Sequence, residues 1–148
     1  MRRGNDLMNT KKNIQIIYTE DLKITNKKQL IKDFYTAFIS QNVEFILDHV
    51  ENDIHWKIAD VSQIIGKEMF AKRLKQMAKH RIKTLHIKNI IINGRTIAVN
   101  GVIHTDDHKN YSFCDIYHFS DIGENAKIQI ISTYTNNLPI KFTDVCYN

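Results

Sequence analysis

The sequence predicts an α+β fold in one domain. Amphipathic helical patterns dominate the first half of the chain, and period-two strand patterns dominate the second half. Because the late strands follow one another through short turns, we expect an antiparallel sheet that curls around the helices. The chain has 148 residues, of which 43% are hydrophobic and 25% charged, so it is long enough to bury one ordinary core.

Composition divides the chain into three segments. Residues 1–24 form a polar, basic extension with one short apolar stretch from Ile14 to Tyr18, which can dock on the body. Residues 25–137 carry the regular patterns and form the domain. Residues 138–148 contain the only proline and are predicted to be a loose tail.

The first helix is predicted over residues 27–41. It follows Thr25 and Asn26, which are good N-cap residues. Tyr35 flanks the apolar stripe of this helix and can present its hydroxyl at the edge of that stripe. The stripe consists of Leu30, Ile31, Phe34, Ala37 and Phe38.

Two further helices are predicted before the strands dominate. Asn42 caps a short helix over residues 43–50, and Gly66 precedes a longer one over residues 67–81. The longer helix has an apolar seam at i, i+4 and i+7, opposite a face of Lys and Arg. The seam consists of Phe70, Leu74 and Met77.

Five strands are predicted. The first, over residues 53–59, places Ile54, Trp56 and Ile58 on one face, and residues 60–65 after it are expected to be a connection. The last four strands form a meander, and Asn93-Gly94 between the first two of them is a strong hairpin signal. These four strands span residues 85–93, 96–104, 109–119 and 127–135.

The strand KNYSFCDIYHF, residues 109–119, carries the strongest functional signal. Its aromatic residues alternate onto one face, and Asp115 falls in the middle of that face. Strand interiors rarely contain Asp, and a carboxylate against apolar walls is costly unless it is hydrogen-bonded or protonated. Two interpretations stay open, a structural hydrogen bond or slipped register on one side and an acid in a cavity on the other.

Six segments occur in an order and spacing typical of one superfamily. They are FYTAFISQNVEFILDHV, DIHW, GKEMFAKRL, IIINGRTIAVNG, CDIYHF and KIQIISTYTN, within about Lys27 to Asn137. On these segments the chain resembles the nuclear transport factor 2-like superfamily, within it the polyketide-cyclase (SnoaL-like) and ketosteroid-isomerase branch. The resemblance implies a cone-shaped half-barrel, in which a bent sheet wraps three helices around a deep apolar pocket. It also implies a homodimer through the outer face of the sheet, which carries Cys114, Ile116 and His118.

The resemblance gives Asp115 a role, because it falls where the isomerase branch has its oxyanion-hole acid and cyclase-like relatives place an acid or base. An apolar wall raises a carboxyl pKa, so the group can donate a hydrogen bond to an oxyanion. If it is held ionised, it can act as a base.

The other members of the isomerase site match less well. Phe34 stands where the isomerases have a Tyr donor, and Tyr35 lies about 100° further around the helix. The general base expected after the first strand has no carboxylate in register, Asp60 being the nearest, and no Asp-Arg-Asp set of the epoxide-hydrolase kind can be assembled. The sequence therefore does not predict a steroid isomerase.

The predicted function is binding of a small organic molecule in an apolar pocket. If the protein is catalytic, we expect cofactor-free acid/base chemistry such as isomerisation, cyclisation or dehydration, centred on Asp115 and assisted by Tyr35 and His104. The expected pocket walls are Phe34, Trp56, Phe113 and Tyr117. The alternative is a non-enzymatic ligand-binding or dimerisation module of the same fold.

We expect neither a metal nor a cofactor. The HTDDH segment over residues 104–108 offers metal-capable atoms, but its spacing matches no defensible site, so adventitious binding explains it better. No glycine-rich phosphate loop is present.

The net charge of +5 suggests a third interpretation. Basic residues between Lys67 and Lys83 crowd one helix with only Glu68 opposing them, as a nucleic-acid patch would. An ordinary solvated helix face explains the same pattern, since no exposed aromatic residues interleave for base stacking. We therefore expect no nucleic-acid partner.

The sequence also predicts a cytoplasmic protein. Its longest apolar runs are far shorter than a membrane span, and the basic amino terminus is not followed by an apolar signal-peptide region. Cys114 and Cys146 look like two thiols in a reducing compartment rather than a disulfide framework.

Overall fold

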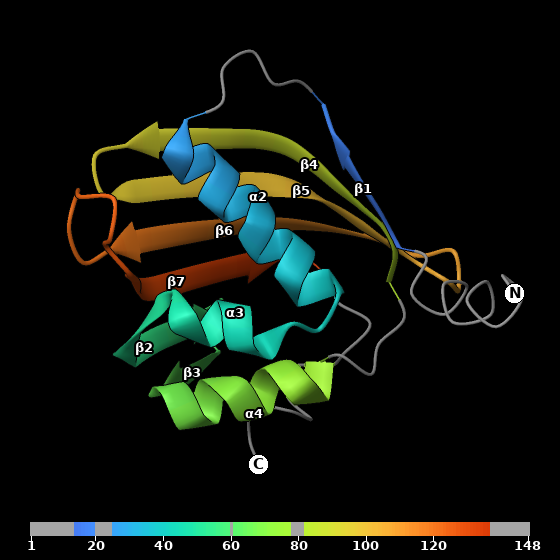
Figure 1. The fold of residues 1–148 in the computed structure, drawn as a ribbon. Coiled ribbons are helices and arrows are strands. Elements are labelled where there is room, and N and C mark those ends of the chain that lie inside the picture. Colours follow the sequence, from blue (N-terminus) through green and yellow to red (C-terminus); the bar gives the residue numbers. More distant parts are fainter. Residues whose placement is uncertain (1–13, 20–24, 60, 78–81, 137–148) are drawn as a thin grey trace, which may run out of the picture.

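A curved sheet wraps three helices in the computed structural model, which describes residues 14–19, 25–59, 61–77 and 82–136 (Figure 1). The predicted α+β fold and the curling of the sheet around the helices are confirmed. Parts of several predictions lie outside the described residues: most of the extension over 1–24, Asp60, residues 78–81 of the third helix, the tail over 138–148, and Cys146.

The helices within the described ranges are α2 (Asn26–Ile39), α3 (Val43–Asp48) and α4 (Lys67–Met77). The strands are β1 (Gln15–Tyr18), β2 (Val50–Ile58), β3 (Ser62–Ile65), β4 (Ile82–Asn93), β5 (Thr96–Thr105), β6 (Asn110–Phe119) and β7 (Ile128–Thr135). They form one seven-stranded sheet in the order β1-β4-β5-β6-β7-β2-β3. The β1–β4 and β2–β7 pairs are parallel, and all other neighbouring pairs are antiparallel.

Local signals in the sequence set the starts of two helices and one hairpin. The Thr25 hydroxyl accepts a hydrogen bond from the backbone N–H of Lys28 at 3.2 Å, and the Asn42 side chain accepts one from Phe45 at 3.2 Å. Both are the predicted N-caps. Gly94 adopts a φ of +61° in the turn between β4 and β5, where a residue with a side chain would be strained.

Two strands, β1 and β3, were not predicted. Each has only four residues, too few for a periodicity to be recognised, and each is held by pairing with a longer strand. β3 occupies the segment predicted as a connection and pairs with β2. β1 is the apolar stretch of the extension, and it docks by pairing in parallel with β4. The Lys32 ammonium lies 4.5 Å from the centre of the Tyr18 ring and adds a contact between α2 and β1.

The concave face of the sheet forms the core with the helices. In β6, the aromatic residues of the predicted face are all buried, and Asp115 lies on that same face, half-buried. The predicted alternation is therefore confirmed, and a slipped register is excluded. The buried aromatic residues of β6 are Tyr111, Phe113, Tyr117 and Phe119.

Gly101 in β5 permits a close approach of two strands beside this core. A Cβ atom at this position would lie 2.1 Å from the His86 carbonyl oxygen and 3.0 Å from the Phe113 ring. The register of β4 shifts between Ile87 and Asn89, next to this point. Only glycine allows the backbones to pack this closely where the sheet is irregular.

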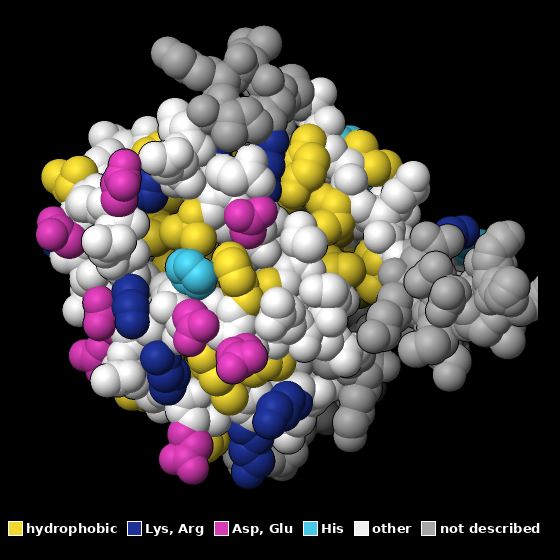
Figure 2. Space-filling model, viewed as in Figure 1, with side chains coloured by type: hydrophobic (Ala, Val, Ile, Leu, Met, Phe, Trp, Pro, Cys, Tyr) yellow, Lys and Arg dark blue, Asp and Glu magenta, His cyan; other side chains and the backbone are white. Residues whose placement is uncertain are grey.

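Helix α4 buries its predicted seam, but its basic face is not uniformly solvated. Phe70 and Leu74 are buried and Met77 packs against the core, as predicted. Arg73 is also buried, at 9% exposure, so it belongs to the interior and not to a basic surface. On the face shown in Figure 2, Lys and Arg side chains alternate with Asp and Glu, and no patch of one sign dominates. None of the helices that the structure describes is long and apolar enough to cross a membrane.

Candidate functional site

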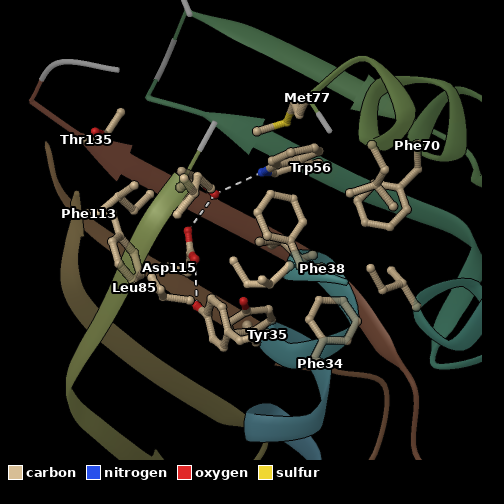
Figure 3. A pocket seen from close by; sticks show the side chains of 18 residues that line it. Phe34, Tyr35, Phe38, Trp56, Phe70, Met77, Leu85, Phe113, Asp115 and Thr135 are labelled. Atoms are coloured by element: carbon tan, nitrogen blue, oxygen red, sulfur yellow. Dashed lines mark hydrogen bonds between the residues drawn. The ribbon is translucent and has the colours of Figure 1, made fainter. Parts of the chain in front are cut away.

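A pocket lies between the concave face of the sheet and the helices (Figure 3). Its volume is about 100 Å³. An apolar cavity of roughly 150 Å³ holds benzene, so this smaller pocket has the size for a molecule smaller than benzene, such as a short chain. Its apolar lining consists of Phe34, Phe38, Ile39, Ile46, Trp56, Phe70, Leu74, Met77, Ile82, Leu85, Ile103, Phe113, Tyr117 and Ile131.

The polar groups of the pocket gather around one carboxylate, that of Asp115. The Tyr35 hydroxyl donates to Asp115 Oδ2 at 2.6 Å, and the Thr133 hydroxyl donates to Asp115 Oδ1 at 2.7 Å. Trp56 Nε1 in turn donates to Thr133 Oγ1 at 2.9 Å. Figure 3 shows this chain of three hydrogen bonds, with Asp115 in the middle of the aromatic side chains. Among the described residues lining the pocket, Asp115 is the only carboxylate, and none is an arginine.

Strand register brings these groups together. Asp115 on β6 is the direct cross-strand partner of Thr133 on β7, and Thr133 is in turn paired with Ile58 on β2. Trp56 points to the same side of the sheet as Ile58, because the two are separated by one residue. Helix α2 crosses this face of the sheet and supplies the Tyr35 hydroxyl from above (Figure 1).

Burial dominates the electrostatics of the site. It raises the pKa of the Asp115 carboxyl, although hydrogen bonds to Tyr35, Thr133 and, most weakly, Tyr117 lower it. Burial, followed by the nearby negative charge of Asp115, raises the pKa of Tyr35 and of Tyr117 well above 10. Both tyrosines therefore keep their protons at neutral pH, and Asp115, whose pKa is raised, is the acid of the site best placed to exchange one.

The structure brings most of the predicted site residues into this pocket. Tyr35 contacts Asp115 directly, and the four predicted wall residues all line the hollow. Phe34 and Tyr35 are both buried despite their angular separation, because α2 lies across the sheet with a broad face. The Phe34 ring packs edge-on against Tyr117 at 5.8 Å, so it is Tyr35 and not Phe34 that reaches the carboxylate.

His104 does not belong to this pocket. Alternation along β5 turns Ile97, Val99 and Ile103 toward the core, so His104 lies on the outer face of the sheet. There its ring hydrogen-bonds the Asn110 side chain across the β5–β6 pair. The role predicted for His104 as an assistant to Asp115 is therefore abandoned.

Among the pocket residues that were not predicted from the sequence, Thr133 and Phe70 make the most direct contacts with the predicted ones. Phe70 was predicted only as part of a helix seam, but its ring packs edge-on against Trp56 at 5.5 Å and lines the pocket. Thr133 could have been found by aligning β7 against β6 through their short connection, which pairs it with Asp115. The mixed pattern IQIISTYT hid that register, because apolar residues occur on both faces of β7.

No metal cluster is found within the described ranges, where no three His, Cys, Asp or Glu side chains gather around a common point. In the HTDDH segment, Asp107 is engaged locally, since it accepts a hydrogen bond from Thr105 and lies 3.7 Å from the Lys109 ammonium.

Comparison with known proteins identifies similar chains of the same architecture. Residues 31–128 match the family model of the SnoaL-like domain. No curated protein matches the chain significantly. Among solved structures, a nuclear transport factor 2-like protein of unknown function from Burkholderia pseudomallei has a TM-score of 0.63 at 15% identity. That comparison covers 76% of this chain and 92% of the other.

Two similar structures carry names that imply chemistry. A putative SnoaL-like polyketide cyclase from Shewanella denitrificans has a TM-score of 0.63 at 10% identity, covering 74% of this chain and 89% of the other. An epoxide hydrolase from M. tuberculosis has a TM-score of 0.58 at 14% identity, covering 73% of this chain and 80% of the other. At these identities the structural likeness establishes the fold alone.

Proposed function

This chain belongs to the SnoaL-like domain family, and we propose that its apolar pocket binds a small organic molecule with Asp115 as the polar centre. The observation that carries the proposal is one hydrogen-bonded carboxylate in an otherwise apolar hollow large enough for a guest. Pockets that combine apolar walls with a few convergent polar groups and a perturbed pKa are typical ligand sites.

Asp115 does not contribute to stability in its ionised form. Burial raises its pKa in spite of three hydrogen bonds, so the ionised carboxylate is less stable in the folded protein than in water. An apolar residue at this position would avoid the penalty and fill part of the hollow. A functional requirement accounts for the carboxylate, since active sites are where such penalties are tolerated.

The chemistry best suited to this arrangement is proton transfer without a cofactor. As a carboxylate, Asp115 takes a proton from an acidic C–H bond of the bound molecule, and the electron pair moves into the ligand's conjugated system. The carboxylic acid so formed returns the proton to a different atom, which regenerates the carboxylate. Isomerisation, cyclisation and dehydration can all be built from these steps. Tyr35 keeps its own proton and steadies the charge on Asp115 by hydrogen bonding.

The test is a ligand screen on the wild-type protein and Asp115→Asn, followed by incubation of each hit in D₂O. We expect hits to bind Asp115→Asn at least about tenfold more weakly, the value of one hydrogen bond to a charged group. Hits with an acidic C–H bond should gain deuterium only with the wild-type protein. Asp53→Asn is the control, because Asp53 is exposed on β2 and away from the pocket lining. Equal affinity and equal exchange in all three proteins would remove Asp115 from the function.

A non-enzymatic ligand-binding module of the same fold is the second candidate. The mostly apolar lining supports it, since binding needs only a hollow and one orienting group. Hits that bind in a manner dependent on Asp115 but never exchange deuterium would favour this module over an enzyme.

We also propose that two copies associate through the outer face of the sheet. Cys114, Ile116 and His118 on β6 are only partly covered there. Ile91 on β4 and Tyr134 on β7 are 62% and 46% exposed, which makes the surface mildly apolar. A cytoplasmic location stays a prediction from the sequence.

A further inference from the structure

The described protein donors nearest to Asp115 all point at its carboxylate. Tyr35 donates to Oδ2 and Thr133 donates to Oδ1, so each carboxylate oxygen already accepts one hydrogen bond from the protein. These are the distances of charge-assisted bonds, at 2.6 and 2.7 Å. The arrangement leaves the pocket short of donors and well supplied with acceptors.

Trp56 determines the direction of the bond from Thr133. An indole N–H can only donate, and Trp56 Nε1 is directed at Thr133 Oγ1 at 2.9 Å. The hydroxyl oxygen is thus an acceptor from Trp56, and its single proton is available for Asp115 Oδ1. Trp56 and Thr133 together hold Asp115 as an acceptor.

A bound molecule can hydrogen-bond only to the acceptor positions of Asp115 that the protein does not occupy. An ionised carboxylate has about four acceptor positions, and Tyr35, Thr133 and, weakly, Tyr117 occupy three of them. A hydroxyl group on the ligand can donate to a remaining position, whereas a carbonyl oxygen would face another acceptor. The rest of the lining is apolar apart from Thr135 and the Tyr117 hydroxyl, which interacts only weakly with the carboxylate.

We propose that the pocket selects small alcohols over ketones and aldehydes of the same shape, and that Thr133 is the positioning residue that sets this preference. This inference rests on the proposed function, since it concerns the ligand of the same pocket. The volume of about 100 Å³ limits the ligand to a molecule smaller than benzene, which a cavity of roughly 150 Å³ holds. The three-carbon pair 2-propanol and acetone are therefore matched probes, which share the carbon chain and differ in the hydrogen-bond donor.

Protonation of Asp115 should abolish the preference. A carboxylic acid can donate a hydrogen bond, so at low pH Asp115 can donate one to the ketone oxygen, which the ionised carboxylate at higher pH cannot do. Two other titratable groups face Asp115, Tyr35 from α2 and Tyr117 from β6 itself. Both keep their protons between pH 4 and pH 8. Cys114, its neighbour in sequence, has a raised pKa and stays a thiol. Asp115 alone therefore sets the midpoint of the change.

The test is a protein NMR titration of the full chain with 2-propanol and acetone between pH 4 and pH 8. At pH 8 we expect the wild-type protein to bind the alcohol about tenfold more tightly, with the ratio falling toward one at low pH. In Thr133→Val the midpoint should move to higher pH because a bond that lowers the Asp115 pKa is lost, so the ratio measured at the wild-type midpoint should fall. Thr133→Ser should restore both.

The possible failures are distinguishable. Equal binding of the two probes by the wild-type protein at pH 8 would overturn the selectivity and leave ligand binding intact. A ratio and midpoint unchanged in Thr133→Val would overturn the role of Thr133, since mere damage to the fold weakens both probes alike. Binding of neither probe would count against the pocket as a site for small organic ligands and therefore against both proposals.

Discussion

Replacing Tyr35 by Phe removes one hydroxyl from the site and leaves the ring in place. The Tyr35 ring packs against Phe113 at 6.1 Å and Tyr117 at 6.2 Å, and Phe preserves both contacts. The lost interaction is the 2.6 Å hydrogen bond to Asp115. A hydrogen bond to a charged group contributes about 1.5–3 kcal/mol, so Tyr35→Phe should lower the free energy of unfolding by that amount at pH 8.

The loss should depend on pH in a defined direction. The Asp115 pKa is raised in the folded protein, so its ionisation destabilises the fold above that pKa, and this penalty is absent below the unfolded value of about 3.9. Tyr35 lowers the folded pKa, and its removal enlarges the penalty. The difference between wild type and Tyr35→Phe should therefore be largest above the folded pKa and shrink as the pH falls toward about 4.

Urea denaturation at several pH values measures this difference directly. For a chain of this length, each kcal/mol corresponds to roughly 2–4 °C in Tm, which gives an independent check by thermal unfolding. Tyr134→Phe is the control, because Tyr134 is 46% exposed on the outer face and should change stability by less than about 0.5 kcal/mol. If Tyr35→Phe is as stable as the wild type, or its loss is the same at every pH, the hydrogen bond to an ionised Asp115 is refuted.

Three further predictions concern the fold, the pocket and the surface. Gly101→Ala should destabilise by about 1–3 kcal/mol or more, because the new Cβ would lie 2.1 Å from the His86 carbonyl oxygen; a wild-type urea midpoint would contradict this. Phe70→Ala should cost about 3–5 kcal/mol and admit larger molecules such as six-membered rings in NMR titrations, whereas unchanged ligand size limits would place Phe70 outside the pocket wall. Ile116→Lys should convert a dimer to monomers in sedimentation velocity while Ile122→Lys, in an exposed loop, does not; a wild-type monomer would refute association through this face.

The sequence predicted those parts of the site that depend on alternation within one strand. Asp115 lies on the aromatic face of β6 because period two requires it, and the same rule placed Trp56 in the core. N-caps and the Asn-Gly turn were predicted because their causes lie within a few residues of each other. The short strands β1 and β3 were not, because only their pairing with distant strands makes them strands.

The remaining features depend on how elements are placed relative to one another. The contact between Tyr35 and Asp115 requires the angle at which α2 crosses the sheet, which periodicity does not give. The pairing of Thr133 with Asp115 depends on the register between strands. A one-residue change in register would exchange the two faces of a strand, so this assignment needed the three-dimensional structure. The face of His104 follows from alternation with Ile97, Val99 and Ile103 along β5, so it could have been predicted.

The most direct test of the site is the ionisation of Asp115 itself, followed through its carboxyl carbon by ¹³C NMR as the pH is varied. We predict a midpoint above the ordinary value of about 3.9, and a change in this resonance when 2-propanol is added at pH 8. A midpoint at or below the ordinary value, with a resonance that the alcohol does not move, would contradict a carboxylate buried among apolar walls and available to a guest.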